Sequence, residues 1–481
     1  MDNRAAIFQG TIVRAPLLRF AVEPHRGPPQ RPAQARARDF GEVYEAFAPE
    51  AAAAQASRCS QCGVPFCQSG CPLRNNIPDW LQAAAEGRVR DAYDLAAATS
   101  TFPEVCGRIC PQDRLCEGAC VVGQAGFGTV TIGAVERWLG DTAWEEGWVA
   151  PVRPLRPERD QSVGIVGAGP AGLSAAERLR EQGFRVTIYD RHDRAGGLLA
   201  YGIPGFKLEK QVVERRVARL EEGGIVLALG VEVGRSLPFA ELRARHDAVL
   251  LATGVYRARA LEAPGATIPA LDFLISSNRA AAMGARPAID AAGKRVVVLG
   301  GGDTAMDCVR TAVRQGAAEV RLAYRRDRAN MPGSAREVAR AEEEGVDFDW
   351  LSAPLAVTPE GVEVRRMRLG AADSGGRRAP EPTSETALAP ADLVIGALGF
   401  DAEDLPALFA APDLATTPHG AVRLPDGGCA TTLPGVFAAG DIVRGASLVV
   451  WAIRDGLDAA AKIGAWLDAQ AAAPAARVAA E

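Results

Sequence analysis

Two stretches of the chain share one order of apolar and polar positions. In the first, a short apolar strand at Val163–Val166 precedes a glycine-rich turn, a helix bearing Ala and Leu, and a second strand at Arg185–Tyr189. In the second, a strand at Val296–Leu299 leads through glycines into a helix at Thr304–Gln315 and a strand at Val320–Tyr324. Short strands that alternate with helices are typical of βαβ units and parallel sheets. The chain is therefore predicted to contain two such units.

Further apolar runs extend both units. They are a helix at 208–222, strands near 225–233, 248–253 and 393–397, a strand directly before Gly440, and a helix at 448–467. Because the second unit begins before the first is complete, we predict an α/β fold with two Rossmann-like dinucleotide-binding domains, one inserted in the other. The predicted limits are 160–290 and 391–475 for the first domain and 291–390 for the second. Within the second, 355–386 alternates polar strands with turns and predicts a hairpin excursion.

The N-terminal third has a different pattern and predicts a small α-helical domain over residues 1–155. A pair of helices fits 77–98, one helix fits 132–138, and an Ala-rich helical run covers 42–56. Residues 1 to about 55 have the composition of an arm, with many Arg and Pro residues from Pro24 to Arg38. We expect this arm to wrap either its own domain or a partner.

Length, net charge and cysteine content limit the classes of protein to which this chain can belong. A chain of 481 residues is long enough for about three domains, each with its own core. Its net charge of −5 gives no reason to expect nucleic acid or an anionic membrane as a partner. No apolar run is long enough to span a membrane and the first residues do not resemble a signal peptide, so we expect a cytoplasmic protein. Ten cysteines in a reducing compartment then indicate metal or redox chemistry in place of disulfides.

The first glycine turn has the form G-x-G-x-x-G and is followed, at the end of the second strand, by an acid. In such a turn Gly167 permits the tight bend, Gly169 lets the backbone approach a pyrophosphate, and Gly172 allows the helix to pack closely on the strand. Asp190 stands where a carboxylate accepts hydrogen bonds from a ribose. This combination predicts a dinucleotide site at the positive end of the helix.

Three later turns of small residues are expected to reach the same ligand. Each follows a predicted strand or opens a predicted helix, and together they contribute Gly197, Leu198, Thr253, Gly254, Gly440 and Asp441. Small residues let the backbone lie against a flat or extended ligand, and the last carboxylate can reach a ribitol or a water that bridges to phosphate.

The second glycine turn has the form G-x-G-x-x-A, and the second strand of its unit ends in basic residues and not in an acid. Gly300 and Gly302 take the glycine positions, and Asp303 and Thr304 open the helix. Where the first unit has an acid, the second has Arg325 and Arg326. Arginines at this strand end accommodate a 2′-phosphate, which favours NADPH over NADH, although an Arg-rich turn can also be an ordinary solvated surface. With the nicotinamide nucleotide assigned to the second unit, FAD is left for the first.

Eight of the ten cysteines form two groups in the N-terminal domain. The groups are Cys59-x2-Cys62-x4-Cys67-x3-Cys71-Pro72 and Cys106-x3-Cys110-Pro111-x4-Cys116-x3-Cys120. Zinc sites use paired C-x2-C knuckles, whereas iron–sulfur clusters use cysteines crowded within a dozen residues and a further cysteine followed by proline. The spacing favours two 4Fe–4S clusters with crossed ligation, and zinc is the alternative. Cys59, Cys62 and Cys67 would share a cluster with one distal cysteine, and Cys71 would join Cys110 and Cys116.

Taken together, these motifs resemble one family over nearly the whole chain. The eight cysteines, Gly167–Gly172, the run Gly196–Pro204, Gly300–Asp307, Tyr324–Gly333 and Gly440-Asp441 are similar to those of the small (beta) subunit of bacterial NADPH-dependent glutamate synthase. The same module resembles the N-terminal part of dihydropyrimidine dehydrogenase and the large subunit of electron-bifurcating ferredoxin–NADP oxidoreductases. The resemblance implies that FAD accepts hydride from NADPH and passes single electrons into the clusters. An FMN-containing large subunit would then make glutamate from glutamine and 2-oxoglutarate.

The resemblance also implies a set of cluster ligands. Cys59, Cys62, Cys67 and Cys120 would hold one cluster, and Cys71, Cys110 and Cys116 would hold three irons of the other. Cys106 is the obvious fourth ligand by residue type, but related proteins use a side chain at the position of Glu136, and we favour that carboxylate.

Three functions remain open from the sequence. The first is the electron-input subunit of glutamate synthase, in a hetero-oligomer. The second is the same module serving another partner, in pyrimidine reduction or in a ferredoxin–NADP oxidoreductase complex. The third is a zinc-stabilised scaffold that binds nucleotides without turnover. Hydride transfer needs no acid–base residue of the protein, so no catalytic residue is predicted. Lys207 and Met331 either line the gap between flavin and nicotinamide or are a solvated lysine and a core methionine.

Overall fold

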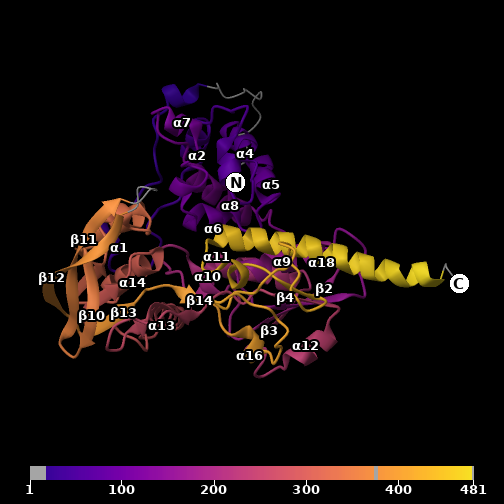
Figure 1. The fold of residues 1–481 in the computed structure, drawn as a ribbon. Helices are drawn as coiled ribbons and strands as arrows, with labels where there is room; N and C mark the ends of the chain where they lie inside the picture. Colours follow the sequence, from indigo (N-terminus) through magenta and orange to yellow (C-terminus); the bar gives the residue numbers. More distant parts are fainter. Residues whose placement is uncertain (1–17, 373–377, 479–481) are drawn as a thin grey trace.

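The structure, a computed structural model, describes residues 18–372 and 378–478, and three parts are visible in Figure 1. The N-terminal domain is helical, and two nucleotide units lie below it with parallel sheets of their own. The first 17 residues of the predicted arm and residues 373–377 of the predicted hairpin lie outside the described residues. Among the described residues, no helix has the length and apolar character that crossing a membrane requires.

Short helices build the N-terminal domain around a core that contains Trp80, Leu81 and Ile132. The helices are α2 (Pro49–Ala56), α3 (Phe66–Gly70), α4 (Ile77–Ala85), α5 (Val89–Ala97), α6 (Pro103–Ile109), α7 (Val121–Gln124) and α8 (Ile132–Glu145). The helix expected over 42–56 begins only at Pro49, whose fixed φ suits the first turn of a helix. The described part of the arm before it has a 3-10 helix, η1 (Arg19–Ala21), and a short α-helix, α1 (Ala33–Arg36), and it wraps its own chain.

The first nucleotide unit has a five-stranded parallel sheet in the order β15-β4-β1-β2-β3. Its strands are β1 (Ser162–Val166), β2 (Arg185–Asp190), β3 (Val226–Leu229), β4 (Ala248–Leu251) and β15 (Val436–Ala438). Its helices are α9 (Pro170–Glu181), α10 (Leu198–Tyr201), α11 (Lys210–Glu222), α12 (Phe239–Arg245), α16 (Leu405–Leu408), α17 (Asp441–Arg444) and α18 (Val449–Val478). β15 reaches this sheet only after the whole second unit, which confirms that one unit is inserted in the other.

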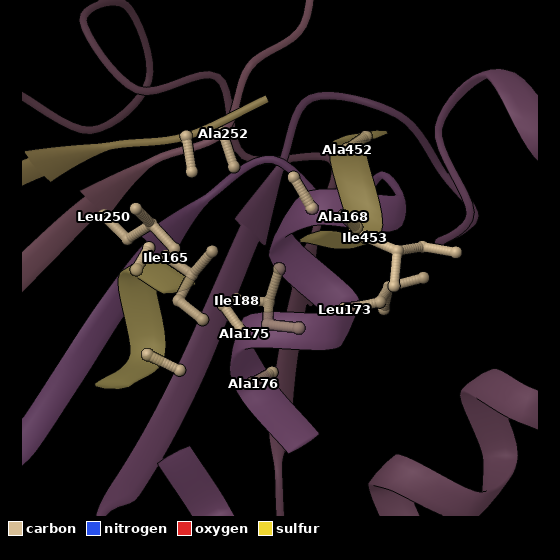
Figure 2. Close-up of a cluster of buried hydrophobic side chains, with 14 of the residues drawn as sticks. Ile165, Ala168, Leu173, Ala175, Ala176, Ile188, Leu250, Ala252, Ala452 and Ile453 are labelled. Atoms are coloured by element: carbon tan, nitrogen blue, oxygen red, sulfur yellow. The ribbon is translucent and has the colours of Figure 1, made fainter. Parts of the chain in front are cut away.

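The core of the first unit lies between its sheet and the helices α9 and α18 (Figure 2). Ile165 and Ile188 from the strands meet Leu173 from α9 and Ile453 from α18, and each is at most 1% exposed. Burying one such side chain contributes about 1.5–3 kcal/mol. The core therefore holds the start of α9 firmly against the end of β1, where the first glycine turn lies.

The second nucleotide unit has a five-stranded parallel sheet in the order β6-β13-β7-β8-β9. Its strands are β6 (Ile268–Pro269), β7 (Arg295–Leu299), β8 (Glu319–Tyr324), β9 (Asp347–Trp350) and β13 (Leu393–Gly396), and its helices are α13 (Ala270–Met283), α14 (Asp303–Arg314) and α15 (Ala335–Glu343). The predicted hairpin is an antiparallel three-stranded sheet of β10 (Ser352–Thr358), β11 (Gly361–Ala372) and β12 (Arg378–Pro390).

The predicted limits of the two units need a correction. The limit at 391 puts β13 in the first unit, but β13 pairs with β7 in the second sheet, and β6 and α13 also pack there. The chain crosses between the units at a small antiparallel pair, β5 (Arg257–Ala258) and β14 (Phe400–Asp401). The second unit therefore includes 268–396. The apolar run 393–397 alone does not indicate which sheet it joins, because either sheet buries it equally well.

Candidate functional site

The carboxyl ends of four strands meet at one edge of the first sheet. β1, β2, β4 and β15 run parallel. β1, β4 and β15 lead into glycine-containing turns singled out from the sequence, and β2 ends at Asp190. In open parallel sheets ligands bind at this edge. The structure therefore brings Gly167, Asp190, Thr253 and Gly440 to a common edge.

The three glycines of the first turn occupy different surroundings. Gly167 has a φ of +111°, and a Cβ there would lie 2.3 Å from the carbonyl oxygen of Ala252. A Cβ on Gly172 would lie 2.0 Å from the carbonyl oxygen of Gly167. A Cβ on Gly169, in contrast, would have no atom within 4 Å. Two glycines are therefore required by the protein itself, and the third leaves open space beside the start of α9.

Asp190 links this turn to the second strand. One of its carboxylate oxygens accepts a hydrogen bond from the Ala168 N–H at 2.7 Å, and the other accepts one from the His192 N–H at 2.8 Å. A cavity of about 50 Å³ lies beside it. Two buried atoms that line this region, Thr253 Oγ1 and His192 Nε2, have no hydrogen-bond partner within the described part of the chain. Buried polar atoms normally have partners, so the groups present here fit a nucleotide.

The other predicted contacts of the first unit lie close by. Gly197 touches the glycine turn directly, because a Cβ on it would lie 2.8 Å from the Cα of Gly169. Leu198 begins α10 beside it, and Gly254 has a φ of +70° in the turn after β4. Asp441 begins α17 and accepts a hydrogen bond from the Ser447 hydroxyl at 2.6 Å. Burial raises the pKa of Asp441.

The second unit has a similar glycine turn, in which one glycine is required by the protein itself and another leaves open space. Gly300 has a φ of +139°, with the carbonyl oxygen of Ala397 2.3 Å from the position of a Cβ. Gly302 has no atom within 4 Å of such a Cβ, so its side of the turn is open. Asp303 accepts a hydrogen bond from the Ser334 N–H at 2.8 Å, and Thr304 follows it in the first turn of α14.

Arg325 and Arg326 directly follow β8, as expected from the sequence. Arg325 is exposed, and Arg326 is partly buried with a buried Nε that has no hydrogen-bond partner among the described residues. A guanidinium donor without a partner at a strand end is suited to an anionic group of a ligand.

A cavity of about 430 Å³ lies where the N-terminal domain, both nucleotide units and the arm meet. Its lining includes Cys110 from the N-terminal domain, Lys207 and Leu448 from the first unit, and Asp303 and Asp307 from α14. We call it the central cavity. This volume is in the range of small-molecule sites.

Lys207 crosses from the first unit to the second at this cavity. Its Nζ lies 2.9 Å from Asp307 Oδ1 and 3.9 Å from Glu337 Oε2. Burial raises the pKa of Asp307 to about 6, and the lysine ammonium opposes that rise. The sequence left Lys207 open between a cavity residue and a solvated lysine, and the structure places it in the cavity. Met331 instead packs against the core of the second unit.

One group of cysteines surrounds a small cavity of its own. Cys59, Cys62, Cys67 and Cys120 line a space of about 20 Å³, together with the exposed Phe66. All four are free thiols. Burial raises the pKa of Cys59 to about 12 and that of Cys67 to about 11, so a ligated metal would have to displace their protons. These are the four residues that the family resemblance assigns to one cluster.

The remaining thiols lie around Glu136. The carboxylate is near enough to Cys71, Cys110 and Cys116 to raise the pKa of each, although burial or the neighbouring Cys106 is the larger cause. Burial also raises the pKa of Glu136 well above its ordinary value, and the structure gives its carboxylate no hydrogen bond or ion pair within the described residues. Cys106 has neighbours of its own, since it lies beside Cys110 and its Sγ is 3.9 Å from the Ser100 hydroxyl.

Comparison with known proteins agrees with this division. Residues 36–148 match the family described as dihydropyrimidine dehydrogenase domain II, 4Fe-4S cluster, and residues 161–456 match the family of pyridine nucleotide-disulphide oxidoreductases. The chain is 56% identical over 479 residues to the glutamate synthase [NADPH] small chain of Azospirillum brasilense, covering 97% of this chain and 99% of that one. The chain belongs to the glutamate synthase small-chain family. It is an oxidoreductase with an iron–sulfur domain and a pyridine nucleotide-disulphide oxidoreductase fold.

Two further proteins are similar to parts of this chain or to most of it. The putative oxidoreductase AegA of Escherichia coli is 43% identical over 473 residues, which cover 92% of this chain and 70% of that protein. Among solved structures, FprA of Mycobacterium tuberculosis in complex with NADPH matches with a TM-score of 0.54 and 21% identity, over 66% of this chain and 86% of that one. That likeness concerns the fold.

The zinc-stabilised scaffold considered from the sequence is wrong. The N-terminal domain matches a 4Fe-4S family, and the rest of the chain matches an oxidoreductase family.

Proposed function

We propose that the chain is the electron-input subunit of a glutamate synthase. It would oxidise NADPH with FAD and pass the electrons through two 4Fe–4S clusters to an FMN-containing large subunit, which makes glutamate from glutamine and 2-oxoglutarate. The observation that carries this proposal is the central cavity, because both nucleotide units and a cysteine of the second cluster set line it together. We expect the complex to be cytoplasmic.

The residues described above would divide the two nucleotides between them. FAD would lie along the first unit, over the residues Gly167, Gly169, Gly172, Asp190, Gly197, Leu198, Thr253, Gly254, Gly440 and Asp441. NADPH would lie along the second unit, over Gly300, Gly302, Asp303, Thr304, Arg325 and Arg326. When bound, FAD supplies the acceptance of a hydride and the release of single electrons. The protein binds and orients the nucleotides and encloses the space between them.

We assign the cluster ligands as the resemblance implies. Cys59, Cys62, Cys67 and Cys120 would hold one cluster, and Cys71, Cys110, Cys116 and Glu136 the other. The cavity that the first four cysteines share supports the first set. For the second set, the Glu136 side chain is partly buried and its carboxylate has no hydrogen bond or ion pair within the described residues, so ligation to iron would supply a partner. Glu136 contributes to the raised pKa of all three thiols of this set, and Cys106 contributes to that of Cys71, Cys110 and Glu136 itself.

The choice between Glu136 and Cys106 is testable by paired substitutions. Glu136→Ala is expected to lose about half of the iron, because one of two clusters loses a ligand, whereas Cys106→Ser is expected to retain both clusters. Iron content and the cluster signal in electron paramagnetic resonance are measured on each purified protein. Loss of a cluster in the Cys106 variant alone would contradict our assignment.

The proposed function is tested first with the isolated chain. It is expected to reduce an artificial acceptor such as ferricyanide with NADPH and to form no glutamate from glutamine and 2-oxoglutarate. Glutamate is expected only when a large FMN-containing subunit is added or co-purified. A chain that fails to oxidise NADPH would contradict the proposal.

A second candidate is the same module serving another partner, in pyrimidine reduction or a ferredoxin–NADP oxidoreductase complex. The similarity to AegA supports this second candidate function, because that protein carries a similar chain within a longer one. Active NADPH oxidation without glutamate formation in the presence of the large subunit would favour this second function.

A further inference from the structure

The described part of the N-terminal arm, residues 18–48, contacts all three parts of the molecule. Glu42 forms ion pairs with Arg108 and Arg137 of the N-terminal domain at 2.7 and 2.8 Å. The Val43 N–H donates to the carbonyl of Phe206 in the first unit at 3.1 Å. The ring of Tyr44 lies 4.4 Å from the guanidinium of Arg340 in the second unit. The arm therefore lies at the junction that surrounds the central cavity.

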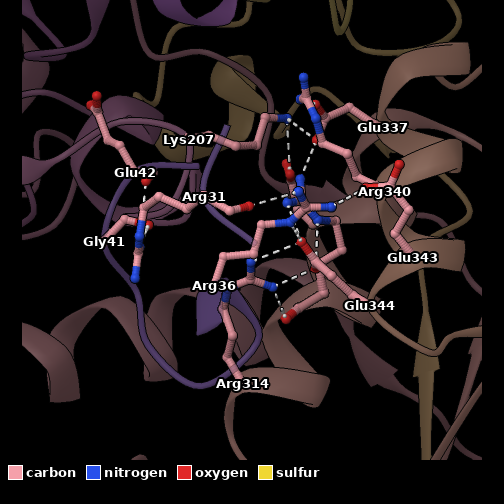
Figure 3. Close-up of polar contacts among 12 residues, drawn as sticks. Arg31, Arg36, Gly41, Glu42, Lys207, Arg314, Glu337, Arg340, Glu343 and Glu344 are labelled. Atoms are coloured by element: carbon pink, nitrogen blue, oxygen red, sulfur yellow. Dashed lines mark hydrogen bonds and ion pairs between the residues drawn. The ribbon is translucent and has the colours of Figure 1, made fainter. Parts of the chain in front are cut away.

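Arg36 of the arm contacts carboxylates of the second unit (Figure 3). It lies at the end of α1 and is only 2% exposed. Its Nε donates to Glu344 Oε1 at 2.9 Å, and its Nη2 donates to Glu343 Oε2. These carboxylates are the last residue of α15 and the residue that follows it. A buried guanidinium with two carboxylates fixes both the distance and the orientation between arm and helix.

The contact continues from the arm to the central cavity through a series of ion pairs (Figure 3). Glu344, whose side chain is fully buried, also accepts hydrogen bonds from Arg310 and Arg314 of α14. Arg310 Nη1 in turn lies 2.6 Å from Glu337 Oε2, which is 3.9 Å from Lys207 Nζ. The arm and the lysine in the cavity are thus the two ends of one charged network.

The same network contacts the first unit at an aromatic ring. The guanidinium groups of Arg310 and Arg314 lie 4.5 and 3.9 Å from the ring centre of Phe206, which is almost fully buried. Phe206 directly precedes Lys207, so the network supports the segment that carries the cavity lysine. Displacing α14 and α15 would disturb both contacts at once.

We propose that Arg36 is a positioning residue for hydride transfer, which holds α14 and α15 of the second unit in register with the first unit across the central cavity. The proposal rests on the proposed function, because the two nucleotides must meet in this cavity. Arg36 does not line the cavity itself and acts through Glu344 and the network behind it. Its loss would allow the second unit to shift, and a misplacement of about 1 Å is enough to slow a reaction about 100-fold.

The test uses the full chain with its FAD and clusters, and compares Arg36→Met with Arg38→Met. Arg38 is exposed in the same arm, and the structure gives its side chain no ion pair or hydrogen bond within the described residues. In Arg36→Met we expect flavin reduction at saturating NADPH to slow about 10-fold, with a weaker charge-transfer absorbance between nicotinamide and flavin. The KM for NADPH should stay within about twofold, because the glycine turn and arginines that bind it are unchanged.

Hydrogen exchange supplies a second readout that does not depend on turnover. Amides of α15 are expected to exchange about 10-fold faster in Arg36→Met and at the wild-type rate in Arg38→Met. Arg36→Lys keeps the charge beside Glu344 and loses the second hydrogen bond, so it should fall between wild type and Arg36→Met.

Wild-type flavin reduction in Arg36→Met would overturn the proposal. If that variant is not recovered folded, a wild-type rate in Arg36→Lys overturns it instead. Failure of the wild-type chain to oxidise NADPH would contradict the proposed function, and the exchange of α15 would then decide the role of Arg36 separately.

Discussion

Gly169→Ala is expected to leave the chain folded and to weaken FAD binding about 10- to 100-fold. Gly169 has a φ of −81°, which alanine adopts freely, and the added methyl group would meet no protein atom within 4 Å. The open space beside it faces the start of α9, where the pyrophosphate is expected. A methyl group forced into an occupied space costs about 1–3 kcal/mol, and each 1.4 kcal/mol is a factor of about ten in affinity. Flavin fluorescence titration of the cofactor-free chain measures the change.

Gly172→Ala is the matched control, because the same methyl group there would collide with the protein itself. Its Cβ would lie 2.0 Å from the carbonyl oxygen of Gly167. We expect the free energy of unfolding of the cofactor-free chain to fall by about 3 kcal/mol, whether or not FAD is added later. Urea unfolding distinguishes the two variants. Wild-type FAD affinity in Gly169→Ala would mean that the pyrophosphate does not approach this turn.

Local patterns were sufficient to predict both nucleotide units and the helical N-terminal domain. A strand, a glycine turn and a helix are specified by residues that are neighbours in the sequence, as in Val163–Gly172. The partner of a strand is not specified locally, and β13 shows the consequence. Its apolar run fits either sheet, and its place depends on contacts with β7, about a hundred residues earlier in the chain. The limits of the units were therefore wrong although their elements were right.

The site residues were likewise predictable where a local motif marks them, and were missed where their role depends on contacts between distant segments of the chain. The glycines, the strand-end residues and three cysteines of the first set were identified from motifs, and the family resemblance added Cys120. The structure places them at sheet edges or around one cavity. Asp307, Glu337 and Arg36 were not singled out as functional residues. Asp307 ends the motif Gly300–Asp307, but no local pattern assigns a role to any of the three side chains. A carboxylate in a helix is normally solvated, and an arginine in a Pro-rich arm is normally exposed. Their burial becomes visible only when the three parts of the molecule are assembled.

Arg325→Ala combined with Arg326→Ala is expected to lower kcat/KM for NADPH about 100-fold and to leave kcat/KM for NADH within about twofold. The two residues follow β8 at the place where a 2′-phosphate is bound in related folds, and Arg326 Nε has no partner in the described part of the protein. A hydrogen bond to a charged group contributes about 1.5–3 kcal/mol, so losing two such contacts accounts for a change of this size. Ferricyanide reduction with each nucleotide measures both constants.

Arg328→Ala is the matched control, because it removes a positive charge from the same turn. Arg328 is exposed, and its guanidinium lies 2.5 Å from Glu342, so its charge is already compensated by the protein. Its removal is expected to change kcat/KM for either nucleotide by no more than about twofold. An equal loss with NADPH and NADH in the double variant would show that Arg325 and Arg326 support the fold of this turn. An unchanged preference for NADPH would place recognition of the 2′-phosphate elsewhere on the second unit, because no other feature of NADPH distinguishes it from NADH.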